Sequence, residues 1–260
     1  MIDLHSHLLP GVDDGSRSVE QSVRVLQQFA ADGVTGVCLT PHVLASQASQ
    51  GAPEPHNRAF ESLRLVAPAE LVLYRGAEVM LDRPLEAQVA EDRRVTLNGT
   101  RYILVEFSRL VAAQTVEHAL SNVIAIGLVP VLAHPERYKC CRPAAVSRWK
   151  SLGALMQVDG PTLLSSRSRG IRARELVQLG LADIAAGDNH GDDRSLGPVW
   201  QALLAQDGAM QAQLLCRKNP QAIIEDRLVD PVAPLSWRVS VGDRLRALFD
   251  EIEPQLIRYP

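Results

Sequence analysis

Residues 2–7 read Ile2-Asp3-Leu4-His5-Ser6-His7, a short apolar run that ends in two histidines, and this order recurs along the chain. Each recurrence is an apolar run of three to six residues, then a polar or glycine-bearing turn, then a helical segment. Alternation of this kind predicts parallel strands joined by helices. The apolar runs lie at residues 2–4, 34–39, 71–74, 102–105, 129–133, 154–158 and 182–186. Seven strand–helix units favour an α/β fold of the closed, TIM-like (β/α)7 barrel type, although the strand count alone does not decide between a barrel and an open sheet.

The predicted helices carry apolar residues at spacings of three and four. The clearest lies between residues 18 and 32, with Ser18 as its candidate N-cap and Gly33 after its last turn. The stretch 45–55 is rich in Ser, Gln, Ala and Pro, and we predict an exposed loop there. Because the pattern is the same on both sides of this stretch, we expect a single domain over residues 1–260. Further helical patterns lie at residues 115–126, 143–152, 173–179 and 241–252.

Composition excludes several classes of protein. The net charge of -3 leaves no basic footprint for nucleic acid. The first residues lack the basic segment and apolar run of a signal peptide. The longest apolar stretch, residues 123–133, is too short to cross a bilayer and is broken by Gly127 and Pro130. Four cysteines in 260 residues do not make a disulfide framework. We therefore expect a cytoplasmic protein without a transmembrane segment.

Side chains that can bind metal ions follow six of the seven predicted strands. In a parallel barrel the C-terminal ends of all strands meet at one face, so these side chains should converge. Imidazole and carboxylate donors together suit zinc, manganese or iron. Without a metal ion, so many packed ionisable groups would repel one another. The pattern therefore predicts a metal cluster, in which a carboxylate such as Glu78 can bridge two ions. The side chains are His5 and His7 after the first run, His42 after the second, Glu78 after the third, Glu106 after the fourth, His134 after the fifth, and Asp188 and His190 after the seventh.

The remaining histidines and the cysteines are predicted to have no part in this chemistry. His56 starts one helical segment and His118 lies inside another, so both are expected on the surface. A cysteine-based phosphatase needs a thiolate followed six positions later by arginine, and none of the four cysteines has one. Thiol catalysis is therefore excluded.

The chain resembles the PHP (polymerase and histidinol phosphatase) superfamily, and within it the CpsB/CapC-type bacterial protein-tyrosine phosphatases. The resemblance covers most of the chain. It is carried by the opening sixteen residues, which run from Met1 to Ser16, and by Ala133-His134-Pro135-Glu136-Arg137-Tyr138. Asn219-Pro220 fits the closing helix of that family. The segment after His42 does not match the usual continuation, and Gly187-Asp188-Asn189-His190 stands where the family usually has Ser-Asp-Ala-His.

This resemblance implies the distorted seven-stranded barrel of the PHP type and two or three divalent ions, with manganese expected and iron, cobalt or zinc as alternatives. One ion would bind His5, His7, Glu78 and Asp188. A second would bind Glu78, Glu106 and His134. A third would bind Asp14, His42 and His190, where the choice of Asp14 over its neighbour Asp13 follows from the family pattern alone.

The reaction expected from the resemblance is hydrolysis of a phosphomonoester by in-line attack of a hydroxide generated on the metal. Arg137 and Arg194 are the candidates for stabilising charge on the phosphoryl oxygens, because the planar guanidinium contacts phosphate in a bidentate manner. Asp188 belongs to this catalytic set as well as to the ligands. The expected substrate is a phosphotyrosine-bearing protein, such as the tail of a polysaccharide-export tyrosine kinase.

Two other functions fit the same donors. One is a PHP phosphatase or phosphodiesterase that acts on a small molecule such as histidinol phosphate. The other is a regulatory module that binds metal without turnover. A substrate panel separates the first from a tyrosine phosphatase, and a phosphate-release assay separates the second.

Overall fold

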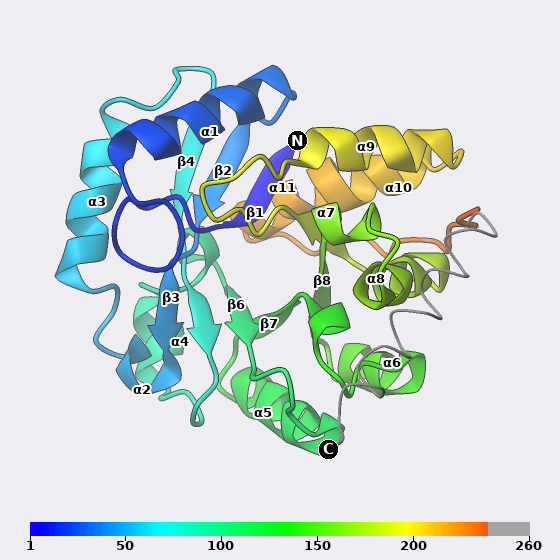
Figure 1. Cartoon of the computed structure of the whole chain (residues 1–260). Coiled ribbons are helices and arrows are strands. Elements are labelled where there is room, and N and C mark those ends of the chain that lie inside the picture. The colour runs from blue at the N-terminus through cyan, green and yellow to red at the C-terminus, as the bar shows by residue number, and fades with distance from the viewer. Residues whose placement is uncertain (239–260) are drawn as a thin grey trace, which may run out of the picture.

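The computed structural model describes residues 1–238, and within them helices surround a set of parallel strands (Figure 1). All strand pairs are parallel, in two sheets of order β1-β2-β4 and β3-β5-β6-β7-β8-β9. The α/β class with parallel sheets is therefore confirmed. The strands are β1 (Ile2–Ser6), β2 (Gly36–Leu39), β3 (His42–Leu44), β4 (Val72–Arg75), β5 (Glu78–Met80), β6 (Tyr102–Glu106), β7 (Val129–Ala133), β8 (Leu155–Asp159) and β9 (Ile184–Ala186).

Each of the seven predicted runs overlaps a strand, but the described residues form nine strands. The additional strands are β3 and β5, which begin three residues after β2 and β4 end. Pro41 lies in the first gap, where it has no backbone N–H to donate to a ladder. Both additional strands have three residues and begin with a polar side chain, His42 or Glu78, so no apolar run marked them.

The end of β1 also contacts the segment after β9. His5 O accepts a hydrogen bond from Asp188 N at 2.9 Å, and Asn189 O accepts one from His7 N at 2.8 Å. Ser6 and Asn189 form a parallel bridge. Within residues 1–238, the first and last strands are therefore adjacent at their C-terminal ends.

The helices mostly follow the predicted periodicity. Ser18 caps α1 by accepting a hydrogen bond from Gln21 N, as predicted. The segment predicted at 173–179 begins earlier, at Ser168, and the segment predicted at 241–252 lies outside the described residues. The helices are α1 (Val19–Ala31), α2 (Ala45–Ala48), α3 (Glu54–Arg64), α4 (Gln88–Asp92), α5 (Ala113–Ala125), α6 (Pro143–Ser151), α7 (Gly160–Leu163), α8 (Ser168–Gln178), α9 (Leu196–Ala205), α10 (Ala209–Gln213) and α11 (Asn219–Ile224), with 3-10 turns η1 (Leu97–Gly99) and η2 (Pro135–Arg137) and a π turn η3 (Leu214–Lys218).

The prediction of an exposed loop at 45–55 was wrong in part. Residues 45–48 form α2, in which Ala45 and Ala48 are buried. The small alanine side chains allow this short helix to pack closely on the strands, and composition alone did not indicate that contact.

The core has an inner and an outer layer because alternate residues of a strand face opposite sides of a sheet. Tyr102 and Leu104 of β6 belong to an inner cluster, together with residues of β1, β2, β7, β9 and α11. Ile103 and Val105 belong to the larger cluster between the strands and the helices. Glu106 therefore continues the inward-facing row of β6. No helix in the described range, residues 1–238, is long and apolar enough to cross a membrane.

Candidate metal centre

The nine predicted metal ligands come together where β1, β2, β4, β6, β7 and β9 end, with His42 and Glu78 as the first residues of β3 and β5. We call these nine residues the histidine–carboxylate cluster. Their donor atoms form four overlapping groups, and within each group all donor atoms lie within 4.8 Å of one another. The role of these side chains as ligands stays a prediction. The groups are His5–His7–Asp188, His5–Glu78–His134, His42–Glu78–Glu106 and His7–Asp14–His42–His190.

Four buried side chains surround one point at the centre of the cluster. The Nε2 atoms of His5 and His7 lie 3.2 Å apart. Glu78 Oε2 lies 3.2 Å from the first and 3.3 Å from the second. Asp188 Oδ1 lies 3.2 Å and 3.4 Å from the same two atoms. Two imidazole nitrogens and two carboxylate oxygens therefore face one another from β1, β5 and the segment after β9.

Glu78 connects this centre to its neighbours. Its Oε1 lies 2.9 Å from His134 Nε2, and its Oε2 lies 3.1 Å from His42 Nδ1. Glu106 Oε1 lies 3.2 Å from the same His42 nitrogen. In the structure Glu106 therefore groups with His42. The family pattern instead places Glu106 and His134 on the same ion.

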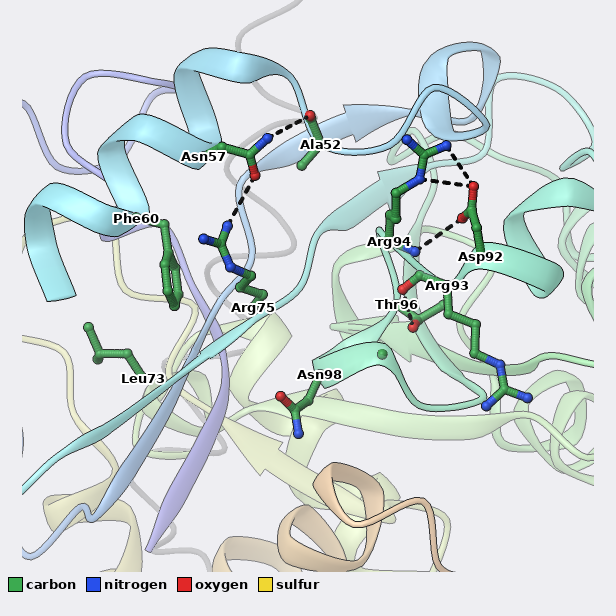
Figure 2. Close-up of a pocket in the computed structure, with 11 residues that line it drawn as sticks. Ala52, Asn57, Phe60, Leu73, Arg75, Asp92, Arg93, Arg94, Thr96 and Asn98 are labelled. Atoms are coloured by element: carbon green, nitrogen blue, oxygen red, sulfur yellow. Dashed lines mark hydrogen bonds and ion pairs between the residues drawn. The ribbon is translucent and has the colours of Figure 1, made fainter.

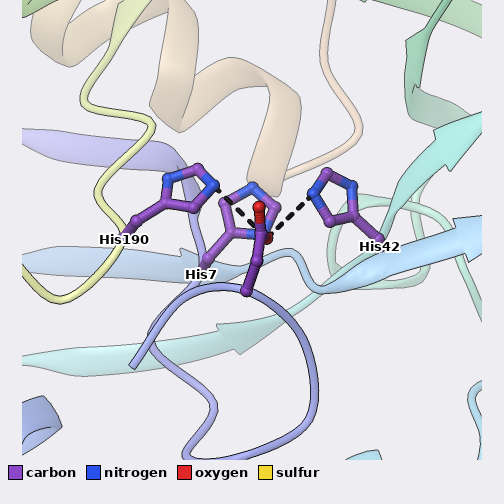
Figure 3. Close-up of side chains that lie close together, drawn as sticks. His7, His42 and His190 are labelled. Atoms are coloured by element: carbon purple, nitrogen blue, oxygen red, sulfur yellow. Dashed lines mark ion pairs between the residues drawn. The ribbon is translucent and has the colours of Figure 1, made fainter. Parts of the chain in front are cut away.

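The outermost group extends from the buried His7 to the exposed Asp14, and Figure 3 shows its three imidazole rings. Its rings of His7, His42 and His190 come from three separate segments, and those of His7 and His190 stack with centroids 4.2 Å apart. Asp14 Oδ1 lies 3.3 Å from His42 Nε2 and 3.5 Å from His190 Nε2. The Asp14 side chain is 70% exposed, so this end of the cluster is open to solvent.

Two residues that the sequence did not single out orient the central histidines. Asp13 Oδ2 lies 2.8 Å from His7 Nδ1, and Gln157 Oε1 lies 3.0 Å from His5 Nδ1. Such contacts fix the ring orientation of metal-binding histidines and leave the other nitrogen facing the ion. The sequence marks Asp13 only as the neighbour of Asp14. Gln157 lies 152 positions from His5 in the chain, so only the folded structure identifies it.

The loop that carries Asp13 and Asp14 folds back onto β1. Ser16 N donates to His7 O at 2.8 Å. A Cβ atom at Gly15 would lie only 2.0 Å from His7 O, so any other residue there would displace the loop. This close approach brings both aspartates to the histidines.

Backbone strain marks two of the cluster residues. His134 and Asp188 follow β7 and β9 with positive φ angles of 34° and 45°. Non-glycine residues rarely adopt this left-handed conformation, and it persists where surrounding contacts impose it, often at functional sites. Here the turns direct an imidazole and a carboxylate toward the cluster.

The electrostatics favour positive charge inside the cluster. Burial raises the pKa of Glu78, but His5 and hydrogen bonds with His134 and His42 outweigh burial and hold this pKa well below its usual value. Burial also raises the pKa of Asp188, but the nearby His5, His7 and Arg137 lower it by more, so this pKa too lies below its usual value. Both carboxyl groups are therefore anionic at neutral pH, and they need cations close by.

The donor set fits divalent metal ions. Asp188 Oδ1 is buried and accepts no hydrogen bond from the described residues. Its nearest donors, the Nε2 atoms of His5 and His7, lie 3.2 and 3.4 Å away without hydrogen-bond geometry, and a cation between these atoms would satisfy this buried oxygen. Imidazole and carboxylate donors within one coordination sphere suit manganese, iron, cobalt or zinc.

The two predicted arginines lie at the edge of the cluster. Arg137, in η2, contacts the carboxylates of Asp159 and Asp188. Arg194 contacts Asp192 through its Nε and lies 3.3 Å from His190 Nδ1 through its Nη2. Each guanidinium is thus paired with an acid and touches a cluster residue.

The two histidines that were expected on the surface differ. His118 on α5 is exposed, as predicted. The prediction for His56 was wrong, because only 8% of it is exposed and it packs in the first turns of α3. Neither belongs to a metal-binding group of the described residues. Cys38, Cys141 and Cys216 are buried free thiols, in agreement with the exclusion of thiol catalysis.

A second polar region lies outside the cluster, in a cavity of about 600 Å³ between α3, β4 and the segment after α4 (Figure 2). We call it the arginine-lined cavity, after Arg75, Arg93 and Arg94. Arg75 Nη2 lies 2.6 Å from Glu61, and Arg94 Nη2 lies 2.6 Å from Asp92. Arg93 lies 3.4 Å from Asp226. Every arginine here has a carboxylate partner and none of the nine cluster residues lines the cavity, so we assign no ligand to it.

Comparison with known proteins gives a consistent result. The family model described as capsular polysaccharide synthesis, CpsB/CapC, matches residues 1–225. The tyrosine-protein phosphatase CpsB of Streptococcus pneumoniae is 29% identical over 244 residues, covering 88% of this chain and 100% of the relative. The tyrosine-protein phosphatase YwqE of Bacillus subtilis strain 168 is 28% identical over 253 residues, covering 93% and 99%.

A solved structure shares the fold. It comes from work on YwqE of Bacillus subtilis and CpsB of Streptococcus pneumoniae, described there as unique metal-dependent tyrosine phosphatases. It superposes with a TM-score of 0.76 at 23% identity, covering 92% of this chain and 100% of the other. At this identity the superposition establishes the fold alone.

Proposed function

Because the chain belongs to the CpsB/CapC family of capsular polysaccharide synthesis, we propose that it is a metal-dependent phosphatase that hydrolyses phosphotyrosine in proteins. Relatives that it matches over at least 88% of its length are named tyrosine-protein phosphatases. The observation that carries the proposal is the central group of two imidazoles and two carboxylates, whose donor atoms face one point. Each imidazole nitrogen lies within 3.4 Å of each carboxylate oxygen.

We assign the ions to the ligand sets that the family resemblance implies. His5, His7, Glu78 and Asp188 would hold one ion. Asp14, His42 and His190 would hold another. Glu78 would bridge to a further ion with Glu106 and His134, as the family resemblance implies. We propose manganese as the ion, and iron, cobalt and zinc suit the same donors. When bound, such ions lower the pKa of coordinated water and polarise phosphoryl oxygens, which supplies a nucleophile at neutral pH.

The arginines bind the phosphoryl group in this proposal. Arg137 and Arg194 are partly exposed, at 23% and 29% of their side chains, and each contacts a cluster residue. A planar guanidinium contacts phosphate oxygens in a bidentate manner and stabilises charge that grows in the transition state. Asp188, which accepts a hydrogen bond from Arg137, couples this arginine to the central donors.

Phosphotyrosine suits a site without an assigned general acid. The phenolic oxygen has a pKa near ~10, so it leaves as an anion more readily than an alkoxide does. The chain therefore has to orient the ester and neutralise its charge more than it has to protonate the leaving group.

For the fold, we propose that the two sheets form one distorted barrel of seven chain passages, with β2 continuing into β3 and β4 into β5. Support comes from the parallel bridge between Ser6 and Asn189, which joins β1 of one sheet to the segment after β9 of the other.

We also propose the tyrosine-rich tail of a polysaccharide-export kinase as the substrate, because the matching family is described by capsular polysaccharide synthesis.

A substrate panel tests the proposed activity. Purified protein is stripped with EDTA, reloaded with manganese, and assayed for phosphate release from a phosphotyrosyl peptide, histidinol phosphate, a nucleotide and a phosphodiester. We expect the peptide to give the highest kcat/KM, and EDTA to abolish the release. Faster turnover of histidinol phosphate by orders of magnitude would identify a small-molecule phosphatase. No release with manganese, cobalt, iron or zinc would identify a non-catalytic module.

A further inference from the structure

A cavity of about 350 Å³ opens directly beside the histidine–carboxylate cluster. This volume lies at the lower end of the range of ~300–1,000 Å³ that is usual for small-molecule sites. Two of its lining residues, His42 and Glu106, belong to the cluster. Any phosphoester bound at the cluster would therefore have part of its structure next to this cavity. The lining residues are His42, Val43, Leu44, Gln47, Met80 and Glu106.

The strand register explains how the cavity adjoins the cluster. His42 of β3 pairs with Glu78 of β5, and two residues later Leu44 pairs with Met80. Met80 in turn pairs with Glu106 of β6. Residues two apart in a strand share one face and lie about 6–7 Å apart. Leu44 and Met80, with Glu106 beside them, therefore form the next row on the face that carries His42 and Glu78, two residues farther along the strands.

This second row is apolar at Leu44 and Met80, beside Glu106, whereas His42 and Glu78 in the first row are both ionisable. Leu44 is 43% exposed although it lies on a strand beside buried residues, and Met80 is only partly buried. Their side chains leave apolar surface open to solvent next to the donor atoms. In a phenyl phosphate, one oxygen joins the ring to phosphorus, so the distance from phosphorus to the ring is no greater than the spacing between the two rows.

Arg137 lies on another side of the cluster from Leu44 and Met80. It contacts Asp159 of β8, whereas those two residues lie on β3 and β5, toward the other end of the six-stranded sheet. Phosphoryl oxygens directed toward Arg137 would leave the ester substituent to point toward β3 and β5. This arrangement gives the substrate one orientation.

From this geometry we infer that Leu44 and Met80 form the subsite that binds the aromatic ring of the substrate and that they determine the preference for aryl over alkyl phosphates. The inference rests on the proposed phosphatase function. Apolar contact with a ring distinguishes a tyrosyl phosphate from a seryl phosphate or a polar metabolite, because the latter have no apolar surface to bury there.

The test compares two phosphonates that are not hydrolysed, phenylphosphonate and methylphosphonate. Their dissociation constants are measured by calorimetry on the full, manganese-loaded chain, for the wild type and for Leu44→Gln and Met80→Gln. Glutamine keeps the approximate size of both side chains but makes them polar. We expect wild type to bind phenylphosphonate more tightly, and each substitution to lower the ratio of the two affinities by about tenfold. The ratio of kcat/KM for phosphotyrosine over phosphoserine should fall in parallel.

Matched controls separate the subsite from a general effect on folding. Leu204 on α9 is 38% exposed, close to the value for Leu44, and Leu204→Gln should leave both ratios unchanged. Leu44→Met, which keeps an apolar side chain, should retain most of the wild-type preference for phenylphosphonate over methylphosphonate. The inference is overturned if wild type does not prefer phenylphosphonate, or if the glutamine variants weaken both phosphonates equally. Absence of phosphate release by wild type would instead refute the proposed function, while the phosphonate affinities would still report on the subsite.

Discussion

The histidine–carboxylate cluster and the arginine-lined cavity are both polar and both lie near the strands, but their charges are balanced in different ways. In the cavity, each arginine has a carboxylate partner, such as Asp92 for Arg94. In the cluster, Asp188 Oδ1 is buried without a hydrogen bond from the described residues. The cavity pairs each arginine with one acid, whereas the cluster gathers buried carboxylates and imidazoles around one point and leaves a buried carboxylate oxygen without a hydrogen bond, an arrangement that a cation would satisfy. We therefore propose the cluster, and not the cavity, as the functional site.

The largest expected effect is the loss of activity when a cluster residue is removed. We predict that His134→Ala and Glu106→Ala each lower the metal-dependent kcat/KM for phosphotyrosine by about 10³-fold or more, because a metal ion contributes several kcal/mol of transition-state stabilisation. Circular dichroism should show that both variants keep the fold. His118→Ala on α5, which is exposed, is the control and should retain activity. Near-wild-type rates in both cluster variants would refute the site.

A smaller effect is expected from the residue that orients His7. Asp13→Asn removes the charge that contacts His7 Nδ1 at 2.8 Å, and loss of such a partner typically costs about 10–100-fold in metal affinity or activity. Manganese affinity measured by calorimetry checks this expectation. The matched substitution in the other region, Asp92→Asn, removes the partner of Arg94 and should leave manganese affinity unchanged. Equal affinities in the two variants would remove the distinction between the regions.

The pH dependence of metal binding sharpens the same contrast. Burial lowers the pKa of His42, but hydrogen bonds with Glu106 and Glu78 raise it to about 10 in the metal-free protein. Burial lowers the pKa of His7 as well, but the hydrogen bond with Asp13 and contacts with Asp188 and Glu78 raise it well above its usual value. Both rings are therefore protonated at pH 7, and a metal ion has to displace these protons.

Manganese binding should consequently release protons, and its affinity should rise with pH by up to about tenfold per unit for each proton released. Calorimetric titration at pH 7 in two buffers with different ionisation enthalpies measures the number of protons. Equal heats in the two buffers would contradict the prediction. His190 should contribute little, because burial and His7 lower its pKa.

The smallest effect is expected in the arginine-lined cavity. Arg94 contacts Asp92 and donates hydrogen bonds to the carbonyl oxygens of Ser49 and Gln50, and its side chain is half exposed. We predict that Arg94→Ala lowers the free energy of unfolding by about 1–2 kcal/mol, since exposed ion pairs and single hydrogen bonds contribute little each. Phosphatase activity should change by less than twofold. Chemical denaturation and the phosphate-release assay measure the two quantities, and a tenfold loss of activity would show that this cavity takes part in function.

Much of the architecture could be predicted because it depends on short-range patterns. The apolar runs located a strand in each of seven places, and the spacing of three and four located α1, α5, α6 and α8. The cap at Ser18 was also predictable, since a hydroxyl before a helical segment has a local role. The strands β3 and β5 were missed because each has three residues and starts with a polar side chain.

The site divides in the same way. The sequence by itself determined which side chains end the strands, and the parallel order of those strands made their convergence foreseeable. The partners of those side chains were decided only by the tertiary structure: Gln157 for His5, Asp13 rather than solvent for His7, and the grouping of Glu106 with His42. The burial of His56 belongs with them. The physical reason is range, because propensity and periodicity act over a few residues, whereas hydrogen bonds and burial depend on segments that meet only when the chain has folded.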